Sequence, residues 1–254
     1  LGWDMARLLS RQTDIFPGEY EKMLGEMLAR RLAGEPLQYI LGEWEFYGLG
    51  FKVTPACLIP RADTEITVST AIKMLPVGAR FADLGTGSGA IAVSVLKNRP
   101  DVTAVAVDIS SAALEVARFN AAQHGTGGRI GFIHADMLAD DFFDSLPHPL
   151  DAIISNPPYI PKSDLLPGAV QPELNFEPRG ALDGGDDGLD FYRSLIPRAA
   201  ETGVLTDGGF VLFEVGAGEA CAVARMGADA GFSSEILCDL GGIERTVILF
   251  AALT

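Results

Sequence analysis

Cysteine and histidine are both scarce in this chain, with 3 of each among 254 residues. Cys57, Cys221 and Cys238 are far apart and odd in number, which argues against a disulfide framework and fits a reducing compartment. We therefore expect a cytoplasmic protein. Neither the cysteines nor the histidines recur at metal-ligand spacing, so we expect no zinc site and no metal catalysis.

The sequence also lacks a long hydrophobic run. No apolar stretch approaches the roughly 18 residues that cross a bilayer, so we expect no membrane span. No basic segment followed by an apolar stretch opens the chain, so no signal peptide is predicted. A start at Leu1 in place of methionine is consistent with residues missing before it.

Basic residues are outnumbered, with 19 Lys and Arg against 34 Asp and Glu, for a net charge of −15. Proteins bind nucleic-acid backbones through basic side chains that neutralise phosphates. The charge balance therefore disfavours a nucleic-acid partner, although a local basic patch would still be compatible with it.

The N-terminal region has a helical pattern from residue 3 to about 35. Five apolar residues recur at helical spacing on one face: Met23, Leu24, Met27, Leu28 and Leu32. We expect this face to pack in a core. Aromatic and β-branched residues over 44–54 predict a short hairpin. We therefore expect a small helical domain over residues 1–43, truncated at its start, and a hairpin linker over 44–62.

Residues 63–254 alternate between apolar, strand-like runs and helical stretches. The predicted strands are Arg80–Leu84, Val102–Val107, Arg129–His134, Leu150–Ser155 and Phe210–Val215, and helices are predicted over 88–98, 110–123, 187–201 and 217–229. This alternation predicts an α/β domain, with a parallel sheet covered by helices on both faces. Two last runs, Ser233–Leu240 and Glu244–Ala251, flank Gly241-Gly242 and predict a hairpin. The sheet should thus have seven strands, the last one antiparallel.

A glycine-rich loop follows the first strand of this domain and opens a helix. It reads Asp83-Leu84-Gly85-Thr86-Gly87-Ser88-Gly89. Glycines permit a tight turn and let a ligand approach the backbone. The spacing Gly-x-Gly-x-Gly differs from the Gly-x-Gly-x-x-Gly of dinucleotide sites, which shifts the prediction away from NAD. We expect this loop to bind a cofactor through Asp83, Gly85, Thr86, Gly87, Ser88 and Gly89.

Acidic residues follow the next two strands. Asp108 ends the second strand, where a carboxylate can accept hydrogen bonds from both hydroxyls of a ribose. The alternative role for Asp108 is to cap the helix that follows. Asp136 and Met137 come after the third strand, where the acid can accept from the amino group of an adenine ring and the methionine can pack on its face.

The most specific motif is Asn156-Pro157-Pro158-Tyr159, directly after the strand Leu150–Ser155. The prolines fix the backbone and leave carbonyls free to accept hydrogen bonds, and Asn156 adds a side-chain acceptor. Tyr159 adds a flat ring with a polar tip. Such a pocket suits a planar group that carries an NH2, either a nucleobase or a glutamine amide. A plain strand-terminating turn is the other interpretation.

The order of these motifs resembles the HemK/PrmC family of glutamine methyltransferases that modify class I peptide chain release factors. The resemblance covers residues from about 33 to the end of the chain. It rests on the glycine loop and on these further segments: Gly34–Gly42, Glu45–Gly48, Leu58–Glu65, Asn156–Tyr159, Glu177-Pro178 and Gly184–Gly188.

The resemblance implies a seven-stranded, Rossmann-like class I methyltransferase sheet and S-adenosyl-L-methionine as the methyl donor. It implies cofactor binding by Gly85–Gly89, Asp108 and Asn156. Asn156, Pro157, Pro158 and Tyr159 would hold the substrate glutamine, with Asn156, Pro157 and Tyr159 as the catalytic residues. Family members usually carry tryptophan where this chain has Met137. The implied partner is a release factor, docked in part by the N-terminal region.

Three other functions remain open from the sequence. A methyltransferase acting on a glutamine of a ribosomal protein would use the same site, and an adenine methyltransferase of nucleic acids would need a basic cleft. A non-catalytic cofactor-binding protein would show erosion of Asp108 or of the Asn156 motif, and both are intact.

Residues 160–190 form a long, acidic connection, which we expect to close over the glutamine-bearing segment, although solvation alone explains most of its acids. Pro60–Glu65 either lines the cofactor cleft or caps the next helix through Asp63 or Thr64.

Overall fold

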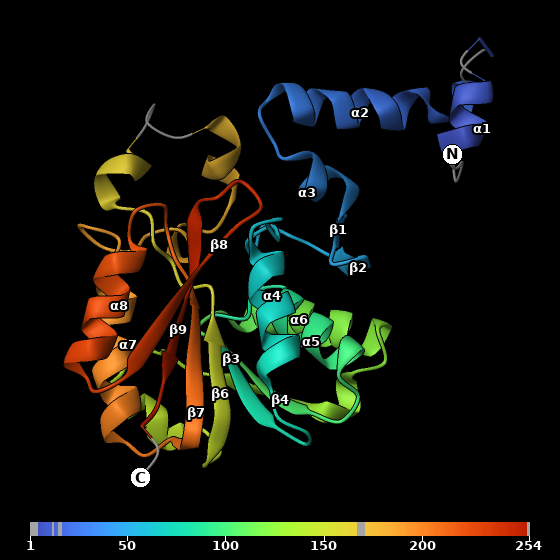
Figure 1. Ribbon diagram of the computed structural model, residues 1–254. Helices are drawn as coiled ribbons and strands as arrows, with labels where there is room; N and C mark the ends of the chain where they lie inside the picture. The colour runs from blue at the N-terminus through green and yellow to red at the C-terminus, as the bar shows by residue number, and fades with distance from the viewer. Residues whose placement is uncertain (1–4, 12, 15–16, 167–170, 253–254) are drawn as a thin grey trace.

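The computed structural model describes residues 5–11, 13–14, 17–166 and 171–252. Its centre is a sheet of seven strands in the order β5-β4-β3-β6-β7-β9-β8 (Figure 1). The strands are β3 (Arg80–Leu84), β4 (Thr103–Asp108), β5 (Ile130–His134), β6 (Leu150–Ser155), β7 (Leu205–Glu214), β8 (Ser233–Cys238) and β9 (Glu244–Phe250). Strands β3 to β7 run parallel, and β9 lies antiparallel between β7 and β8. The predicted α/β class and the reversed last strand are confirmed.

Helices cover both faces of the sheet. On one side lie α4 (Thr64–Met74), α5 (Ala90–Asn98) and α6 (Ser111–Gln123), and on the other α7 (Asp190–Glu201) and α8 (Ala220–Asp229) (Figure 1). Successive residues of a strand point to opposite faces. In β7, accordingly, Phe210 and Leu212 pack in the cluster with α4 and α5, while Val211 and Phe213 pack with α7 and α8. No helix among the described residues has the length and apolar character needed to cross a membrane.

Strand β7 begins five residues earlier than predicted. The sequence placed its start at Phe210, because the apolar run there is Phe210–Val215. The strand instead passes through the glycines with an irregularity in its pairing to β6, where Leu150 pairs with Leu205 and Ala152 with Phe210.

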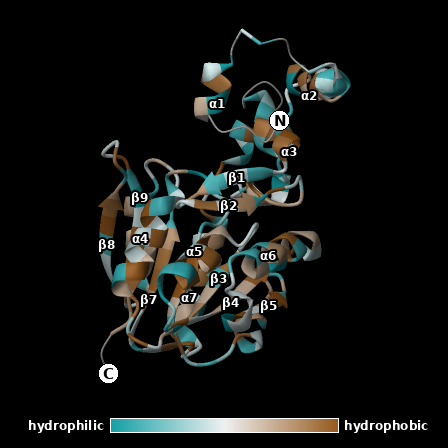
Figure 2. Cartoon of the chain, turned by 90° about the vertical axis from the view of Figure 1, so that its right-hand side faces the viewer, coloured by the Kyte–Doolittle hydropathy of each residue, from teal (hydrophilic) through white to brown (hydrophobic). Residues whose placement is uncertain are grey.

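The N-terminal elements lie at one end of the molecule, beyond the sheet, in both Figure 1 and Figure 2. They are α1 (Met5–Ser10), the 3-10 turn η1 (Gly18–Tyr20), α2 (Glu21–Leu32), α3 (Leu37–Leu41) and the hairpin β1 (Glu43–Phe46) with β2 (Leu49–Lys52). The hairpin matches its prediction. The division into domains at residues 43 and 62 stays a prediction.

The prediction that the apolar face of α2 packs in a core is wrong. Helix α2 buries none of its residues. Leu28 is 52% exposed and Leu32 88% exposed, and Met23 and Leu24 are also exposed. Helical periodicity shows that one face is apolar, but it cannot show whether the chain supplies a neighbour to cover that face.

The hairpin is joined to the sheet domain by the buried side chain of Asn120 on α6. Its Oδ1 accepts a hydrogen bond from the Lys52 N–H at 2.8 Å. Its amide donates to the carbonyls of Lys52 at 3.0 Å and of Ser88, in the glycine loop, at 2.8 Å. One buried amide thus fixes the hairpin against the loop, and Phe46 and Phe51 add apolar contacts to the same cluster as α4 and α5.

The described parts of the long connection between β6 and α7, residues 156–166 and 171–189, contain three 3-10 turns. They are η4 (Lys162–Leu165), η5 (Pro172–Phe176) and η6 (Arg179–Ala181). Its end packs tightly on the Asn156–Tyr159 motif. The Gly184 N–H donates to the Ile160 carbonyl at 2.9 Å, and a Cβ at Gly184 would lie 2.7 Å from the Tyr159 Cα. Only glycine fits this approach between two backbones.

We therefore expect Gly184→Ala to lower the free energy of unfolding by about 1–3 kcal/mol, because the added methyl must displace backbone. The control is Gly180→Ala in the same connection, where a Cβ meets no atom within 4 Å. That change should stay within about 0.5 kcal/mol of wild type. Urea denaturation of the three proteins measures both effects, and coincident transitions would contradict the packing argument.

Candidate active site

The register of the parallel strands gathers the site residues in one row. Leu84 of β3 pairs with both Val107 of β4 and Ser155 of β6, and Ser155 pairs with Phe213 of β7. The residues that follow these four are Gly85, Asp108, Asn156 and Glu214. The structure thus brings together three residues that the sequence singled out, and it adds Glu214 as a fourth.

Asp83 supports the glycine loop from behind. Its side chain is fully buried, and Oδ2 accepts from the Thr86 hydroxyl at 2.7 Å and from the Ala92 N–H at 3.1 Å. Burial raises the pKa of Asp83 to about 6, against the lowering effect of these hydrogen bonds. Asp83 lies outside the cavities described below, so a direct cofactor contact by Asp83 stays a prediction.

The loop itself presents mainly backbone. Gly85 and Gly87 line a cavity, whereas the side chains of Thr86 and Ser88 are buried within the domain. Gly85 has a φ of +70°, and a Cβ there would lie 3.1 Å from the Met137 Cε. A side chain at Gly85 would therefore be strained and would fill space that a ligand needs.

Asp108 bridges the loop and the start of α6. Its Oδ2 accepts from the Gly87 N–H and its Oδ1 from the Ser110 N–H, both at 2.8 Å. The helix cap is Ser110, whose hydroxyl accepts from the Ala113 N–H at 3.2 Å, so the alternative of Asp108 as the cap is wrong. The pKa of Asp108 is raised, mainly by burial. Each carboxylate oxygen retains a lone pair for a ligand hydroxyl.

A cavity of about 380 Å³ lies at this end of the sheet. Its lining includes these predicted cofactor residues: Gly85, Gly87, Asp108, Asp136, Met137 and Asn156. Asp136 is exposed, and its Oδ1 accepts from the Leu138 N–H at 2.9 Å. A cavity of this size, whose lining combines glycine backbone, a carboxylate and apolar side chains, suits a small ligand with a polar part and a flat apolar part.

The sequence missed several residues of this cavity. Ile109 is 63% exposed and lines it beside Asp108, as does Leu138. An apolar residue directly after a strand-end acid was a usable signal for Ile109. The other missed walls are residues 56–58 and parts of 178–183, which come from distant segments and carry no local signal.

The Asn156–Tyr159 motif separates this cavity from a smaller one of about 90 Å³. Asn156 lines both, Pro158 lines the larger and Tyr159 the smaller; Pro157 is buried and lines neither. The Asn156 Nδ2 donates to the Thr64 hydroxyl at 3.2 Å. Burial raises the pKa of Tyr159 to about 12, so its hydroxyl stays protonated at neutral pH.

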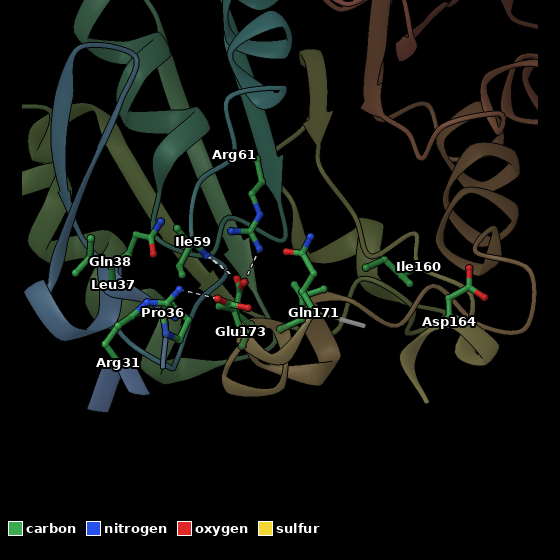
Figure 3. A pocket seen from close by; sticks show the side chains of 12 residues that line it. Arg31, Pro36, Leu37, Gln38, Ile59, Arg61, Ile160, Asp164, Gln171 and Glu173 are labelled. Carbon is green, nitrogen blue, oxygen red and sulfur yellow. Dashed lines mark hydrogen bonds and ion pairs between the residues drawn. The ribbon is translucent and has the colours of Figure 1, made fainter. Parts of the chain in front are cut away.

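The smaller cavity continues into a wide groove of about 780 Å³, with which it shares Arg61, Ile160 and Leu174 (Figure 3). One wall comes from the N-terminal elements: Arg31, Pro36, Leu37 and Gln38. The facing wall comes from the long connection and includes Asp164, Gln171, Glu173 and Glu177. Arg31 joins the two walls by an ion pair with Glu173 at 2.8 Å. The three cavities therefore form a path from the groove to the glycine loop.

An ion pair between half-buried Arg61 and buried Glu177 lies where the groove meets the smaller cavity, since Arg61 lines both. Glu177 Oε1 pairs with Arg61, and Oε2 accepts from the Ile59 N–H at 3.0 Å. Solvation alone therefore does not explain Glu177, which is buried. The prediction that a side chain of Pro60–Glu65 caps the next helix is wrong, because Asp63 makes no side-chain cap bond and Thr64 accepts from Asn156. The described lining of the cavity of about 380 Å³ includes no residue of 60–65, and Arg61 lines the groove and the smaller cavity instead.

Glu214 is the functional candidate that sequence reasoning missed. It is 1% exposed, and burial raises its pKa to about 7. A carboxylate directly after the apolar run Phe210–Phe213 was a signal available in the sequence. Within the described parts of the chain, no group of three or more His, Cys, Asp or Glu side chains is arranged to hold a metal ion.

Comparison with known proteins now gives the family. The family described as Methyltransferase small domain matches residues 64–172, and the PrmC N-terminal domain matches residues 1–42. The crystal structure of a methyltransferase from Pyrococcus furiosus superposes with a TM-score of 0.59 over 92% of this chain and 100% of that one; at 16% identity it shows the fold alone.

Two curated relatives are named release factor glutamine methyltransferase. The protein from Geobacter sulfurreducens is 45% identical over 226 residues, which cover 87% of this chain and 75% of the relative. The protein from Neisseria gonorrhoeae is 43% identical over 243 residues, which cover 95% and 86%. The chain belongs to the release factor glutamine methyltransferase family.

Proposed function

We propose that this protein transfers a methyl group from S-adenosyl-L-methionine to the side-chain amide nitrogen of the glutamine in the Gly-Gly-Gln motif of class I release factors. The observation that carries the proposal is the path of three cavities, which meet at Asn156 and Arg61. A side chain entering from the groove would reach Asn156 on one side while a cofactor lies on the other.

The cavity of about 380 Å³ at the glycine loop fits the cofactor by its shape and its chemistry. Gly85 and Gly87 leave room for a ligand against the backbone, Asp108 offers acceptors for a diol, and Ile109 and Met137 offer apolar surface to a ring. When bound, S-adenosyl-L-methionine supplies a methyl group on a positively charged sulfur, which keeps the bonding electrons when the methyl moves to nitrogen.

The residues of the Asn156 motif would bind and orient the glutamine. Because Asn156 uses its Nδ2 to donate to Thr64, its Oδ1 remains an acceptor for the substrate NH2. An amide nitrogen is a weak nucleophile, so the reaction depends on orientation and on acceptors that stabilise the positive charge forming on that nitrogen. The nitrogen then loses one proton to solvent, and no strong base is needed.

The partner would be a protein and not a nucleic acid. The two arginines of the described groove lining, Arg31 and Arg61, are paired with Glu173 and Glu177, and Asp164 adds a further negative charge. Such a lining is poorly suited to the phosphates of a nucleic acid. The exposed apolar face of α2 beside the groove is a surface of the kind that binds another protein. We propose that the partner docks there, and that the connection 160–190, of which residues 167–170 lie outside the described chain, closes over its glutamine segment.

Methyl transfer from labelled S-adenosyl-L-methionine tests the function directly. We expect label on a release factor that carries Gly-Gly-Gln, and none on its Gln→Ala variant or on DNA. Label on DNA, or on the Gln→Ala variant, would contradict the proposal. Label on a ribosomal protein and not on the release factor would keep the chemistry and change the partner.

Asp108→Asn should weaken cofactor binding roughly 10- to 100-fold, because an amide cannot accept from two N–H groups and a diol together. The matched control is Asp144→Asn, which makes the same change of charge at an exposed residue that lines none of the three cavities. Isothermal titration of both variants with S-adenosyl-L-methionine measures the difference. Equal dissociation constants would exclude the role of Asp108.

Asn156→Ala should reduce kcat by about 100-fold or more while the dissociation constant of the cofactor rises less than about 10-fold. The reason is that the acceptor for the reacting NH2 is lost, whereas the cavity keeps its other walls. Single-turnover rates and cofactor titration separate the two effects. An equal loss of both would mean that Asn156 serves the cofactor more than the glutamine.

A further inference from the structure

Glu214 is a buried carboxyl group for which the proposed reaction has no use so far. It is the last residue of β7, and its Oε2 has no hydrogen-bond partner among the described atoms. Burying a carboxylate without a full set of partners costs stability. Such a group in a strand end beside a candidate site points to a function there.

The register places Glu214 beside Asn156. Ser155 pairs with Phe213, so Asn156, which follows β6, and Glu214, which ends β7, lie side by side at the edge of the sheet. Thr64, the buried first residue of α4, completes the group and accepts a hydrogen bond from the Asn156 Nδ2 at 3.2 Å. Hydrogen bonding from Thr64 and Asn156 lowers the pKa of Glu214, although burial outweighs it and holds that pKa at about 7.

The numbers of protons and lone pairs on Asn156, Thr64 and Glu214 determine which group donates each hydrogen bond and which accepts it. A threonine hydroxyl has one proton, and an ionised carboxylate can only accept. Since the Thr64 oxygen accepts from Asn156, its proton is free for Glu214. We call this arrangement the chain of donation: the Asn156 Nδ2 donates to the Thr64 hydroxyl, and the proton of that hydroxyl can go to Glu214, as can the second Nδ2 proton. The Asn156 Oδ1 remains an acceptor.

We propose that Glu214 is a positioning residue: its ionised carboxylate holds the Thr64 hydroxyl and the Asn156 amide in the orientation in which the Asn156 Oδ1 accepts from the NH2 of the substrate. The inference rests on the proposed function. Without an acceptor at Glu214, the Asn156 amide can turn over and present its NH2, which cannot accept from the substrate NH2. The effect reaches the substrate through Asn156.

Other ionisable groups surround Glu214. They are Asp63 at the start of α4, Arg245 on β9, Tyr159 after β6 and Tyr192 on α7, with Glu219 at the start of α8 next to Tyr192. Asp63 raises the pKa of Glu214 and Arg245 lowers it. Both tyrosines have raised pKa values and stay neutral near pH 7. Near that pH, the main change of charge beside Asn156 is therefore the ionisation of Glu214.

The pH dependence follows from the same directions. Below a pH of about 7 the Glu214 carboxyl is protonated and can itself donate a hydrogen bond. It then no longer has to accept the hydrogen bond of the Thr64 hydroxyl. Above that pH the carboxylate is ionised and the orientation of Asn156 is fixed. We therefore expect kcat to rise with pH through about 7 and then to level.

The contribution of Glu214 to the free energy of unfolding should fall as pH rises, whereas kcat should increase. The pKa of Glu214 is higher in the folded chain than the ordinary value of 4.5, so ionisation opposes folding as pH rises from about 4.5 to about 7. A neutral isostere removes that cost. Glu214→Gln should therefore melt no lower than wild type at pH 8, which a purely structural role for Glu214 would not predict.

The experiment compares Glu214→Gln with Glu219→Gln, using the full chain, labelled S-adenosyl-L-methionine and a release factor with Gly-Gly-Gln. Glu219 is a good control because burial also raises its pKa to about 7, while its Oε2 accepts from the Gly216 N–H at 2.9 Å and not from the Asn156 group. We expect Glu214→Gln to lower kcat roughly 10- to 100-fold, with KM and the cofactor dissociation constant changed less than about 3-fold. Its kcat should no longer rise through pH 7, and Glu219→Gln should keep that rise.

A second pair of variants tests the chain of donation if Glu214→Gln folds poorly. Thr64→Val removes the hydroxyl at nearly constant shape and should lower kcat as Glu214→Gln does, while Thr64→Ser should restore it. Combining Thr64→Val with Glu214→Gln should add little, because both changes break one network.

A wild-type kcat and pH profile in Glu214→Gln would overturn the inference. So would a loss of cofactor affinity and melting temperature in proportion to kcat. Failure of the wild-type protein to methylate Gly-Gly-Gln would instead reject the proposed function, so the two failures are distinguishable.

Discussion

The site depends on the parallel pairing of four strands in one register. Because β3, β4, β6 and β7 run the same way, their carboxyl ends meet at a single edge, and the pairing of Leu84, Val107, Ser155 and Phe213 aligns them within one residue. A slip of one residue in any strand would turn its functional side chain to the opposite face of the sheet. The apolar packing on both faces prevents such slips, so the core also fixes the positions of the site residues.

The groove wall formed by the long connection depends on the ion pair between Arg61 and Glu177. Glu177 holds Arg61 and the Ile59 N–H, and so joins the segment before α4 to the connection after β6, although 116 residues separate the pair. Because Glu177 is buried while Arg61 is 35% exposed, the loss of Arg61 would leave the buried Glu177 charge without its partner and is the more damaging of the two changes. The walls of the groove are therefore set by contacts distant in sequence, whereas the cavity of about 380 Å³ is lined at the strand ends by Gly85, Asp108 and Asn156.

This difference explains how much the sequence could predict. Strand ends carry local signals: an apolar run followed by glycine, Asp108 or Asn156 indicated both the sheet and three members of the row. The roles of Asp83 and Glu177 could not be predicted, because whether an acid faces a ligand or supports a loop depends on its three-dimensional neighbours. The exposed face of α2 was missed for the same reason, since periodicity identifies an apolar face but not what covers it.

The electrostatics of the site connect the overall charge with the proposed chemistry. Asp108 and Glu214 both have raised pKa values, so the site keeps carboxyl groups in surroundings that oppose their ionisation. A ligand with positive charge favours the ionised form of these carboxyl groups, and so does positive charge that develops on a nitrogen during a reaction. A phosphate would disfavour the ionised form. The excess of acidic residues, which first disfavoured nucleic acid as a partner, thus has a local counterpart at the site, and it agrees with the cationic methyl donor and neutral amide that we propose as ligands.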